Sequence, residues 1–215
     1  MNNEKHGNMF IKKNKIFTFS KDKFNWYGEN VLKDRKGWLR EWEPKRSKIA
    51  AAVKKGFRFN LREKNILYIG SSTGTTVSHL SDLTTKEIIG VDIAPIVMRE
   101  FMLLAEMKEN VIPLLYDASK LGECDLLKDT KFDLVFEDIA QRDLVESFIE
   151  NCKLFLKTDG EAWLSLKTRS IDSTKPAKKV LEISKLTIEN AGLKIKKIYN
   201  LDPFEKEHFF LVVGF

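Results

Sequence analysis

Acidic residues follow three of the short apolar runs of this sequence, at the points where strands would end. Asp92 closes the run EIIGVD, Asp117 closes VIPLLYD, and Asp138 closes FDLVFED. Open parallel sheets bind ligands outside the carboxyl ends of their strands, and a carboxylate there accepts hydrogen bonds from ribose hydroxyl groups. A solvated loop would explain any one of these acids, but the series in register favours a ligand site at one edge of a sheet.

A glycine loop lies about 20 residues before the first of these acids, the separation seen in doubly wound nucleotide-binding folds. Gly70 and Gly74 in ILYIGSSTGTT let the backbone approach a ligand, and Thr75 and Thr76 can cap the following helix or bond to the ligand. The loop lacks the middle glycine of G-x-G-x-x-G, which argues against a dinucleotide pyrophosphate. A glycine turn is also ordinary between a strand and a helix, so the prediction depends on Asp92 as well.

Four side chains are candidates for a reaction at a hydroxyl oxygen, which needs a base near the departing proton. Lys167 ends the run LSLK and would accept the proton if a neighbouring cation and partial burial lowered its pKa, while Asp138 held it in place. Lys48 is the candidate cation, and His208 precedes the last apolar run. Lysines are more often solvated and a lone histidine is more often structural, so no single assignment stands by itself.

The elements that must position these residues alternate along most of the chain. Apolar runs typical of buried strands are NILYIG, EIIGVDI, VIPLLYD, FDLVFEDI and EAWLSLK. Helical patterns lie before, between or after them, in RSKIAAAVKKGF, TTVSHLSDL, IVMREFMLLAEMK, DLVESFIENCKLFL and AKKVLEISKLTIENAG. This alternation predicts a mostly parallel sheet that is covered by helices on both faces.

The last two predicted strands, LKIKKIYNL and FFLVVGF, are joined by DPFEKEH, which is too short for a helical crossover. We therefore expect an α/β protein with a Rossmann-like class I methyltransferase fold, in which a mostly parallel seven-stranded sheet has an antiparallel last strand. That strand, placed beside the fifth, would bring His208 toward Lys167. The runs MFIKKNKIFTFS and FNWYGENVL predict a small β-rich unit over residues 1–40, before a main domain over residues 41–215.

Charge and cysteine content narrow the classes of function. Residues 1–58 carry 16 Lys and Arg against 6 Asp and Glu, whereas residues 59–215 carry 21 against 25. A polyanion would lie against the basic front, although a solvated lysine surface explains the same counts. Cys124 and Cys152 lack CxxC spacing, so we expect buried thiols and no metal site. The sequence has no apolar run of about 18 residues and no leader-like start, so we expect a soluble, cytoplasmic protein without a membrane partner.

Five segments together resemble the fibrillarin family in order and spacing. They are WEPKRSKIAAA from Trp42 to Ala52, ILYIGSSTGTTVSHLSD, the DIAQ of Asp138 to Gln141, LKTRSIDST, and DPFEKEH from Asp202 to His208. Tyr27-Gly28-Glu29 is similar to the short motif at the junction of that family's N-terminal β unit. The resemblance covers residues 27–215 and is to the shorter archaeal form, which has no Gly/Arg-rich extension.

The resemblance implies methylation of ribose 2′-hydroxyl groups in rRNA, with tRNA as a second substrate and S-adenosylmethionine as the cofactor. It implies a catalytic set on Lys48, Asp138, Lys167 and His208, with the target ribose entering between Lys167 and Lys48. The cofactor residues, together with Gly70, would be Thr75, Thr76, Asp92, Ile93, Asp117, Ala118, Asp138, Ile139, Ala140 and Gln141. The implied partners are a box C/D guide RNA, a Nop-type scaffold protein and a kink-turn-binding protein of ribosomal type.

Three other functions remain open on the sequence. A methyltransferase for a small molecule would share the cofactor loop but would need no basic front. A non-catalytic RNA-binding subunit would keep the fold, although the presence of Lys48, Asp138 and Lys167 argues against it. A nicotinamide-dependent oxidoreductase is disfavoured by the missing G-x-G-x-x-G.

Overall fold

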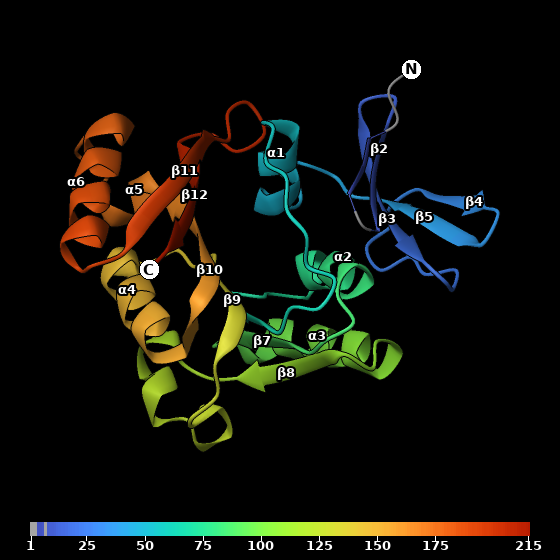
Figure 1. The fold of residues 1–215 in the computed structure, drawn as a ribbon, viewed down its shortest axis with the longest axis horizontal. Helices are drawn as coiled ribbons and strands as arrows, with labels where there is room; N and C mark the ends of the chain where they lie inside the picture. Colours follow the sequence, from blue (N-terminus) through green and yellow to red (C-terminus); the bar gives the residue numbers. More distant parts are fainter. Residues whose placement is uncertain (1–3, 7) are drawn as a thin grey trace.

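The strands of the described residues form two sheets, and the larger sheet is the predicted, mostly parallel one (Figure 1). The computed structural model describes residues 4–6 and 8–215. The seven strands of the larger sheet run in the order β11-β12-β10-β9-β6-β7-β8. They are β6 (Ile66–Ile69), β7 (Ile88–Asp92), β8 (Val111–Leu115), β9 (Phe132–Glu137), β10 (Leu156–Lys167), β11 (Lys194–Asn200) and β12 (His208–Gly214).

Strand direction in the larger sheet agrees with the sequence-based prediction. Strands β6 to β10 pair in parallel, whereas β12 pairs antiparallel with both of its neighbours, β10 and β11. Residues 201–207 are too few to hold a crossover helix, so the chain turns back after β11. The predicted α/β class, with a mostly parallel seven-stranded sheet and an antiparallel last strand, is confirmed.

Helices cover both faces of this sheet because its central strands are apolar on both sides. The first face carries α1 (Lys48–Lys54), α2 (Thr75–Leu83) and α3 (Pro95–Met107), and the second carries α4 (Leu144–Phe155) and α6 (Ala177–Asn190). In β6, Ile66 and Tyr68 belong to the first core and Leu67 and Ile69 to the second, since successive strand side chains alternate. Three short elements were not predicted, namely η1 (Ala118–Glu123), η2 (Asp125–Leu127) and α5 (Thr168–Ile171).

The smaller, N-terminal sheet is antiparallel, and its five strands run in the order β1-β2-β3-β5-β4. They are β1 (Glu4–His6), β2 (Met9–Lys12), β3 (Lys15–Ser20), β4 (Val31–Asp34) and β5 (Gly37–Glu41). Figure 1 shows this sheet at one side of the molecule, next to α2. It agrees with the small β-rich unit expected over residues 1–40, of which residues 1–3 and 7 lie outside the described part. The domain boundary after residue 40 stays a prediction.

Part of the second strand-like run in this unit, FNWYGENVL, forms a loop instead of a strand. The Glu29 carboxylate accepts hydrogen bonds from the backbone N–H groups of Trp26 and Tyr27. Gly28 has a φ of +84°, a left-handed conformation that ends any extended pairing. The prediction was wrong here because a side chain that folds back on its own backbone competes with strand pairing.

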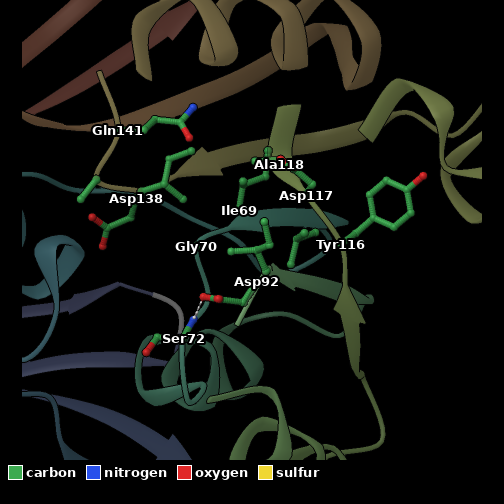
Figure 2. A pocket seen from close by; sticks show the side chains of 13 residues that line it. Ile69, Gly70, Ser72, Asp92, Tyr116, Asp117, Ala118, Asp138 and Gln141 are labelled. Carbon is green, nitrogen blue, oxygen red and sulfur yellow. Dashed lines mark hydrogen bonds between the residues drawn. The ribbon is translucent and has the colours of Figure 1, made fainter. Parts of the chain in front are cut away.

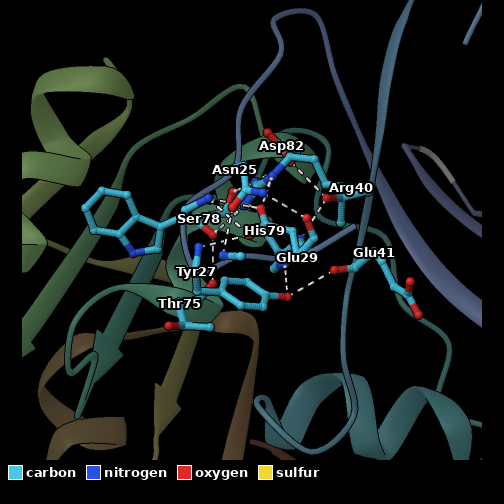
Figure 3. Close-up of polar contacts among 12 residues, drawn as sticks. Asn25, Tyr27, Glu29, Arg40, Glu41, Thr75, Ser78, His79 and Asp82 are labelled. Carbon is cyan, nitrogen blue, oxygen red and sulfur yellow. Dashed lines mark hydrogen bonds and ion pairs between the residues drawn. The ribbon is translucent and has the colours of Figure 1, made fainter. Parts of the chain in front are cut away.

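A buried arginine fastens the N-terminal sheet to α2 (Figure 3). Arg40 of β5 is completely buried, and all five of its side-chain N–H groups donate hydrogen bonds. They reach the carboxylates of Glu29 and Asp82 and two oxygens of Ser78, at 2.6–3.0 Å. Asp82 also accepts a hydrogen bond from Lys108 at 2.7 Å. The network therefore satisfies a buried guanidinium completely, which is the condition under which burial of a charge is tolerated.

A second set of contacts extends this attachment through a neutral histidine. His79 of α2 is fully buried, with Nδ1 2.8 Å from the Thr18 hydroxyl oxygen and Nε2 2.8 Å from the Tyr27 hydroxyl oxygen. Burial, followed by the charges of Arg40 and Lys108, lowers the pKa of His79 well below its usual value. The ring is therefore uncharged, and it links strand, loop and helix by hydrogen bonds alone.

The two cysteines and the length of the helices concern two further expectations. Cys124 and Cys152 are both buried free thiols, as predicted. No helix within residues 4–6 and 8–215 has both the length and the apolar character needed to span a bilayer.

Candidate active site

The carboxyl ends of the central strands meet at one edge of the larger sheet. Ile69 at the end of β6 lies opposite Val91 of β7 and Glu137 of β9. The loops that follow these strands therefore begin side by side, and they enclose a cavity of about 340 Å³ (Figure 2). Nine of the predicted cofactor residues line it: Gly70, Asp92, Ile93, Asp117, Ala118, Asp138, Ile139, Ala140 and Gln141.

Gly70 lets the loops after β6 and β9 approach each other at the floor of this cavity. Its φ is +86°, and a Cβ atom there would lie 2.4 Å from the carbonyl oxygen of Asp138. The two loops meet so closely only because this position has no side chain.

Asp92 is held with part of its carboxylate left for a ligand. The backbone N–H of Ser72 donates to Oδ2 at 2.9 Å, as the dashed line in Figure 2 marks, and that of Ala94 donates to Oδ1 at 3.0 Å. A carboxylate has about four acceptor sites, so these two bonds fix its orientation and leave others for hydroxyl groups. The placement fits the predicted recognition of a ribose.

Two other lining residues of the cavity are a fixed acid, Asp117, and an unpaired amide, Gln141. Asp117 accepts hydrogen bonds from the hydroxyl and backbone N–H of Ser119, and these bonds lower the pKa of the Asp117 carboxyl. The side-chain nitrogen of Gln141 is buried and has no hydrogen-bond partner among the residues that the structure describes. An unpaired buried donor is costly, so this nitrogen fits a site whose ligand supplies the acceptor.

A second cavity adjoins the first and contains the remaining predicted residues. The two cavities share Gly70, Ser72, Asp138, Ile139 and Ala140 in their walls. Thr75 and Thr76, at the start of α2, line the second one. All four predicted catalytic residues also line it: Lys48, Asp138, Lys167 and His208.

These four residues come from four separate elements of the main sheet and its first helix. Lys48 is the first residue of α1, directly after Ser47, whose hydroxyl accepts a hydrogen bond from the N–H of Ala50 as the N-cap. Lys167 is the last residue of β10, and His208, the first residue of β12, lies directly opposite it in the antiparallel register. Asp138 follows β9. The expected approach of His208 to Lys167 is therefore observed.

The ion pairs of this cavity are long, and they differ in one respect from expectation. Lys48 Nζ lies 3.8 Å from Asp138 Oδ2 and 3.6 Å from Glu205 Oε1, so Asp138 pairs with Lys48 instead of holding Lys167. Lys167 is exposed, because it lies at the end of β10 beyond the packed part of the sheet. The partial burial expected for Lys167 is therefore not supplied by the chain alone.

Tyr68 of β6 lines the cavity, although the sequence pattern predicted it only as an apolar position of a strand. It is buried, its ring packs at an angle of 39° against Phe136 with the centroids 4.6 Å apart, and it lines the second cavity. Burial, followed by the charge of Asp138, raises the pKa of Tyr68 well above its usual value, so it is a neutral phenol beside that carboxylate.

Several other wall residues were missed. They are Ile69, Ser72, Val91 and Tyr116 in the first cavity and Arg46, Ser71 and Thr73 in the second. Most adjoin a predicted residue in the sequence, and their positions in the glycine loop or just before Asp92 and Asp117 were the available signal.

Comparison with known proteins gives one consistent family. The family model for fibrillarin matches residues 1–215. The "fibrillarin-like rRNA/tRNA 2′-O-methyltransferase" of Methanocaldococcus jannaschii is 39% identical over 189 residues, which is 86% of this chain and 82% of that protein.

Solved structures agree with this family. A fibrillarin pre-rRNA processing protein of Methanococcus jannaschii has a TM-score of 0.91 at 34% identity, over 100% of this chain and 98% of its own. A fibrillarin/Nop5p complex has a TM-score of 0.87 at 36% identity, over 98% and 99%. Aeropyrum pernix fibrillarin with natively bound S-adenosyl-L-methionine has a TM-score of 0.85 at 29% identity, over 99% and 98%.

Proposed function

This chain belongs to the fibrillarin family, and we infer that its two joined cavities serve to methylate ribose 2′-hydroxyl groups of rRNA, with tRNA as a second substrate. It is an S-adenosylmethionine-dependent RNA 2′-O-methyltransferase, in agreement with relatives that carry this activity in their names. The observation that carries the proposal is the position of Asp138 in the walls of both cavities. A group bound in the first cavity can thereby face a substrate bound in the second.

The residues of the first cavity fit S-adenosylmethionine. Its ribose would be held by the free acceptor sites of Asp92, and its adenine would lie by Asp117 and Ala118. The unpaired amide nitrogen of Gln141 would donate to an acceptor of the ligand. The cofactor carboxylate would face the first turn of α2, where Thr75 and Thr76 stand and where no acidic residue opposes an anion.

The residues of the second cavity carry out the protein's part in the methyl transfer. When bound, S-adenosylmethionine supplies a sulfonium methyl group that an oxygen nucleophile can displace. Lys167 takes the proton of the ribose hydroxyl, for which the bound RNA must supply the burial that the chain lacks. Lys48 holds the Asp138 carboxylate in place through their ion pair. Lys48 and His208 orient the target nucleotide on either side of Lys167.

Partners complete the substrate site. A Nop-type scaffold protein is a partner of this family, as the fibrillarin/Nop5p complex shows. We propose in addition that a box C/D guide RNA and a kink-turn-binding protein of ribosomal type take part. The support for an external guide is that the basic residues 1–58 suit contacts with phosphates, and such contacts position RNA without reading its sequence.

The scaffold protein would dock on α3 and the edge strand β8. Ile96, Leu103 and Met107 form an exposed apolar stripe on α3, and Ile96 is 79% exposed. Ile112 and Leu115 of β8, which ends the larger sheet, are exposed as well. Apolar patches of this kind are typical of protein interfaces. Leu103→Glu should abolish co-purification with the scaffold protein, whereas the matched change Leu186→Glu on α6 should not; equal behaviour of the two would contradict this docking face.

The proposed function is tested by transfer of labelled methyl from S-adenosylmethionine to a guide-paired RNA, with and without the scaffold protein. A target ribose is compared with its 2′-deoxy counterpart in otherwise identical RNAs. We expect incorporation that is lost on the deoxy substrate. Failure of transfer in every assembly, despite measurable cofactor binding, would favour a small-molecule methyltransferase or a non-catalytic RNA-binding subunit.

A further inference from the structure

Arg46 is a cation of the second cavity to which the proposed reaction assigns no role. It stands two residues before Lys48 and lines the same cavity as Lys48, Lys167 and His208. Its side chain is 53% exposed, and among the described residues its one ion pair is with Glu43, at 3.7 Å. An exposed pair of that length contributes little and leaves most guanidinium N–H groups for another partner.

The position of Arg46 is nevertheless fixed from two directions. Its guanidinium lies over the ring of Tyr27, 5.2 Å from the centroid. Its backbone N–H donates to the carbonyl of Glu43, and the next residue, Ser47, is the N-cap of α1. Arg46 is therefore presented at the cavity on a rigid support.

Tyr27 itself is held firmly by the network that joins the two sheets (Figure 3). Its hydroxyl donates to the carbonyl of Glu41 at 3.0 Å and lies 2.8 Å from His79 Nε2. Its backbone N–H donates to the carboxylate of Glu29. The loop between β3 and β4 thus contributes to the active site indirectly, by supplying the ring over which the guanidinium of Arg46 lies.

The covalent structure of RNA indicates which group of the substrate Arg46 can bind. A 2′-hydroxyl group is on the carbon next to the one whose oxygen carries the following phosphate. A ribose that presents its 2′-hydroxyl between Lys167 and Lys48 must therefore bring its 3′ phosphodiester close to the rim of the same cavity. A guanidinium that stacks on a ring keeps its N–H edge free, and that edge matches two phosphate oxygens.

We propose that Arg46 binds the phosphodiester on the 3′ side of the target nucleotide. This inference rests on the proposed function, because it requires a ribose in the second cavity. The other anion in reach is the carboxylate of the cofactor. The start of α2 already offers that carboxylate backbone N–H groups and the hydroxyl of Thr75, whereas the Thr76 hydroxyl donates to Ser47, so the phosphate is the anion left for Arg46.

The test compares Arg46→Gln with Lys45→Gln in the assembled particle, because Lys45 is an adjacent exposed cation outside the cavity. Each variant is assayed on a target RNA with ordinary linkages and on two RNAs with one neutral methylphosphonate, either 3′ or 5′ of the target nucleotide. KM for RNA, kcat, equilibrium binding of the same RNAs, and the Kd for S-adenosylmethionine are measured for each. Thermal unfolding shows that the variants are folded.

We expect Arg46→Gln to raise KM for RNA about tenfold, the loss that follows from removing one charge-assisted hydrogen bond, with kcat and cofactor Kd little changed. Lys45→Gln should change KM less than about twofold, as surface charges usually do. The 3′ methylphosphonate should weaken binding to the parent protein about tenfold and to Arg46→Gln hardly at all, whereas the 5′ substitution should affect both proteins equally.

Three results would overturn the assignment. Equal KM values for the two variants would mean that Arg46 makes no special contact. A full loss caused by the 3′ methylphosphonate in Arg46→Gln would place the contact elsewhere, and a weakened cofactor Kd would assign Arg46 to the cofactor carboxylate. Absence of transfer by the parent protein would instead count against the proposed function, and the binding measurements would still decide the phosphate contact.

Discussion

Two clusters of charged side chains lie near α2, and they treat their cations in opposite ways. In the network between the sheets, Arg40 is completely buried and donates five hydrogen bonds of 2.6–3.0 Å. In the second cavity, Lys48 has contacts of 3.6 and 3.8 Å, and Arg46 has one of 3.7 Å. In the first cluster every N–H group of the arginine side chain donates a hydrogen bond. In the second cluster the cations keep N–H groups that can bind a further partner.

This difference separates structural charge from functional charge. A buried ion that lacked one of its bonds would destabilise the fold, so the network around Arg40 must be complete within the chain. Cations of an active site must keep donors for a substrate, so their internal contacts are long and partial. Substitutions should therefore act on stability in the first cluster and on substrate in the second.

Lys167→Ala should give the largest effect and should act on catalysis alone. Loss of a general base lowers the rate of transfer by about 10²–10⁴-fold. Because Lys167 is exposed, the free energy of unfolding and the Kd for S-adenosylmethionine should stay nearly constant. Single-turnover methyl transfer, thermal unfolding and calorimetry measure the three quantities. Turnover at the parent rate would remove Lys167 from the mechanism.

Arg40→Met should act on stability, by about 3–5 kcal/mol, since it leaves Glu29 buried without its cation and Asp82 paired with Lys108 alone. Denaturant unfolding measures this loss, and transfer by the remaining folded fraction should be affected far less. The matched change in the open cluster, Arg46→Gln, should lower stability by less than about 0.5 kcal/mol. Similar losses for the two arginines would contradict the distinction drawn between the clusters.

Glu137 and Asp138, two consecutive residues, show the same difference between structural and functional charge. Asp138 lines both cavities, and its ion pair with Lys48 is long, at 3.8 Å. Glu137 is completely buried, bonded to Ser147 and Asn151, and burial raises its pKa from 4.5 to about 7. Its folded form therefore binds a proton more tightly than the unfolded chain does. The stability that this proton contributes is complete below pH 4.5 and is lost as the pH rises to about 7.

Glu137→Gln should remove this pH dependence, which amounts to about 3 kcal/mol between those pH values. The measurement is the free energy of unfolding from pH 4.5 to 8 for the parent protein and the variant. Glu182→Gln, an exposed change on α6, is the control and should keep the parent slope. A variant with the parent slope would assign the pH dependence to other groups.

Asp92→Asn should give the smallest effect, mainly on the cofactor, although one of the backbone N–H groups of Ser72 and Ala94 loses its acceptor as well. The amide keeps one acceptor oxygen but loses the charge, so the Kd for S-adenosylmethionine should rise about tenfold. Calorimetry measures the change, and the KM for RNA with saturating cofactor should stay the same. An unchanged cofactor Kd would remove the Asp92 carboxylate from the ribose site.

The fold of the main domain was largely predictable because its information is local. The helical pattern TTVSHLSDL corresponds to α2 residue for residue, and the short link before β12 dictated an antiparallel turn. The acids at strand ends were brought together because parallel strands share one edge. The positions of these residues could be predicted from the spacing of apolar residues and the order of the strands and helices.

The parts that were missed depend on partners far away in the chain. Arg40 and Asp82 are 42 residues apart, and no periodic pattern links them. Tyr68 has the strand period of an apolar residue, and its place beside Asp138 becomes visible only when β6 and β9 pair. The exposure of Lys167 likewise depends on where the neighbouring strands end, which composition does not record.

The position of β12 between β10 and β11 has a consequence for the order in which the protein becomes competent. All residues that line the first cavity lie between Ile69 and Gln141, so they are synthesised before β12. His208 joins Lys167 only when β12 inserts between two strands made earlier. The residues of the cofactor site are therefore synthesised before the last member of the catalytic set, so the chemistry depends on the C-terminal strand.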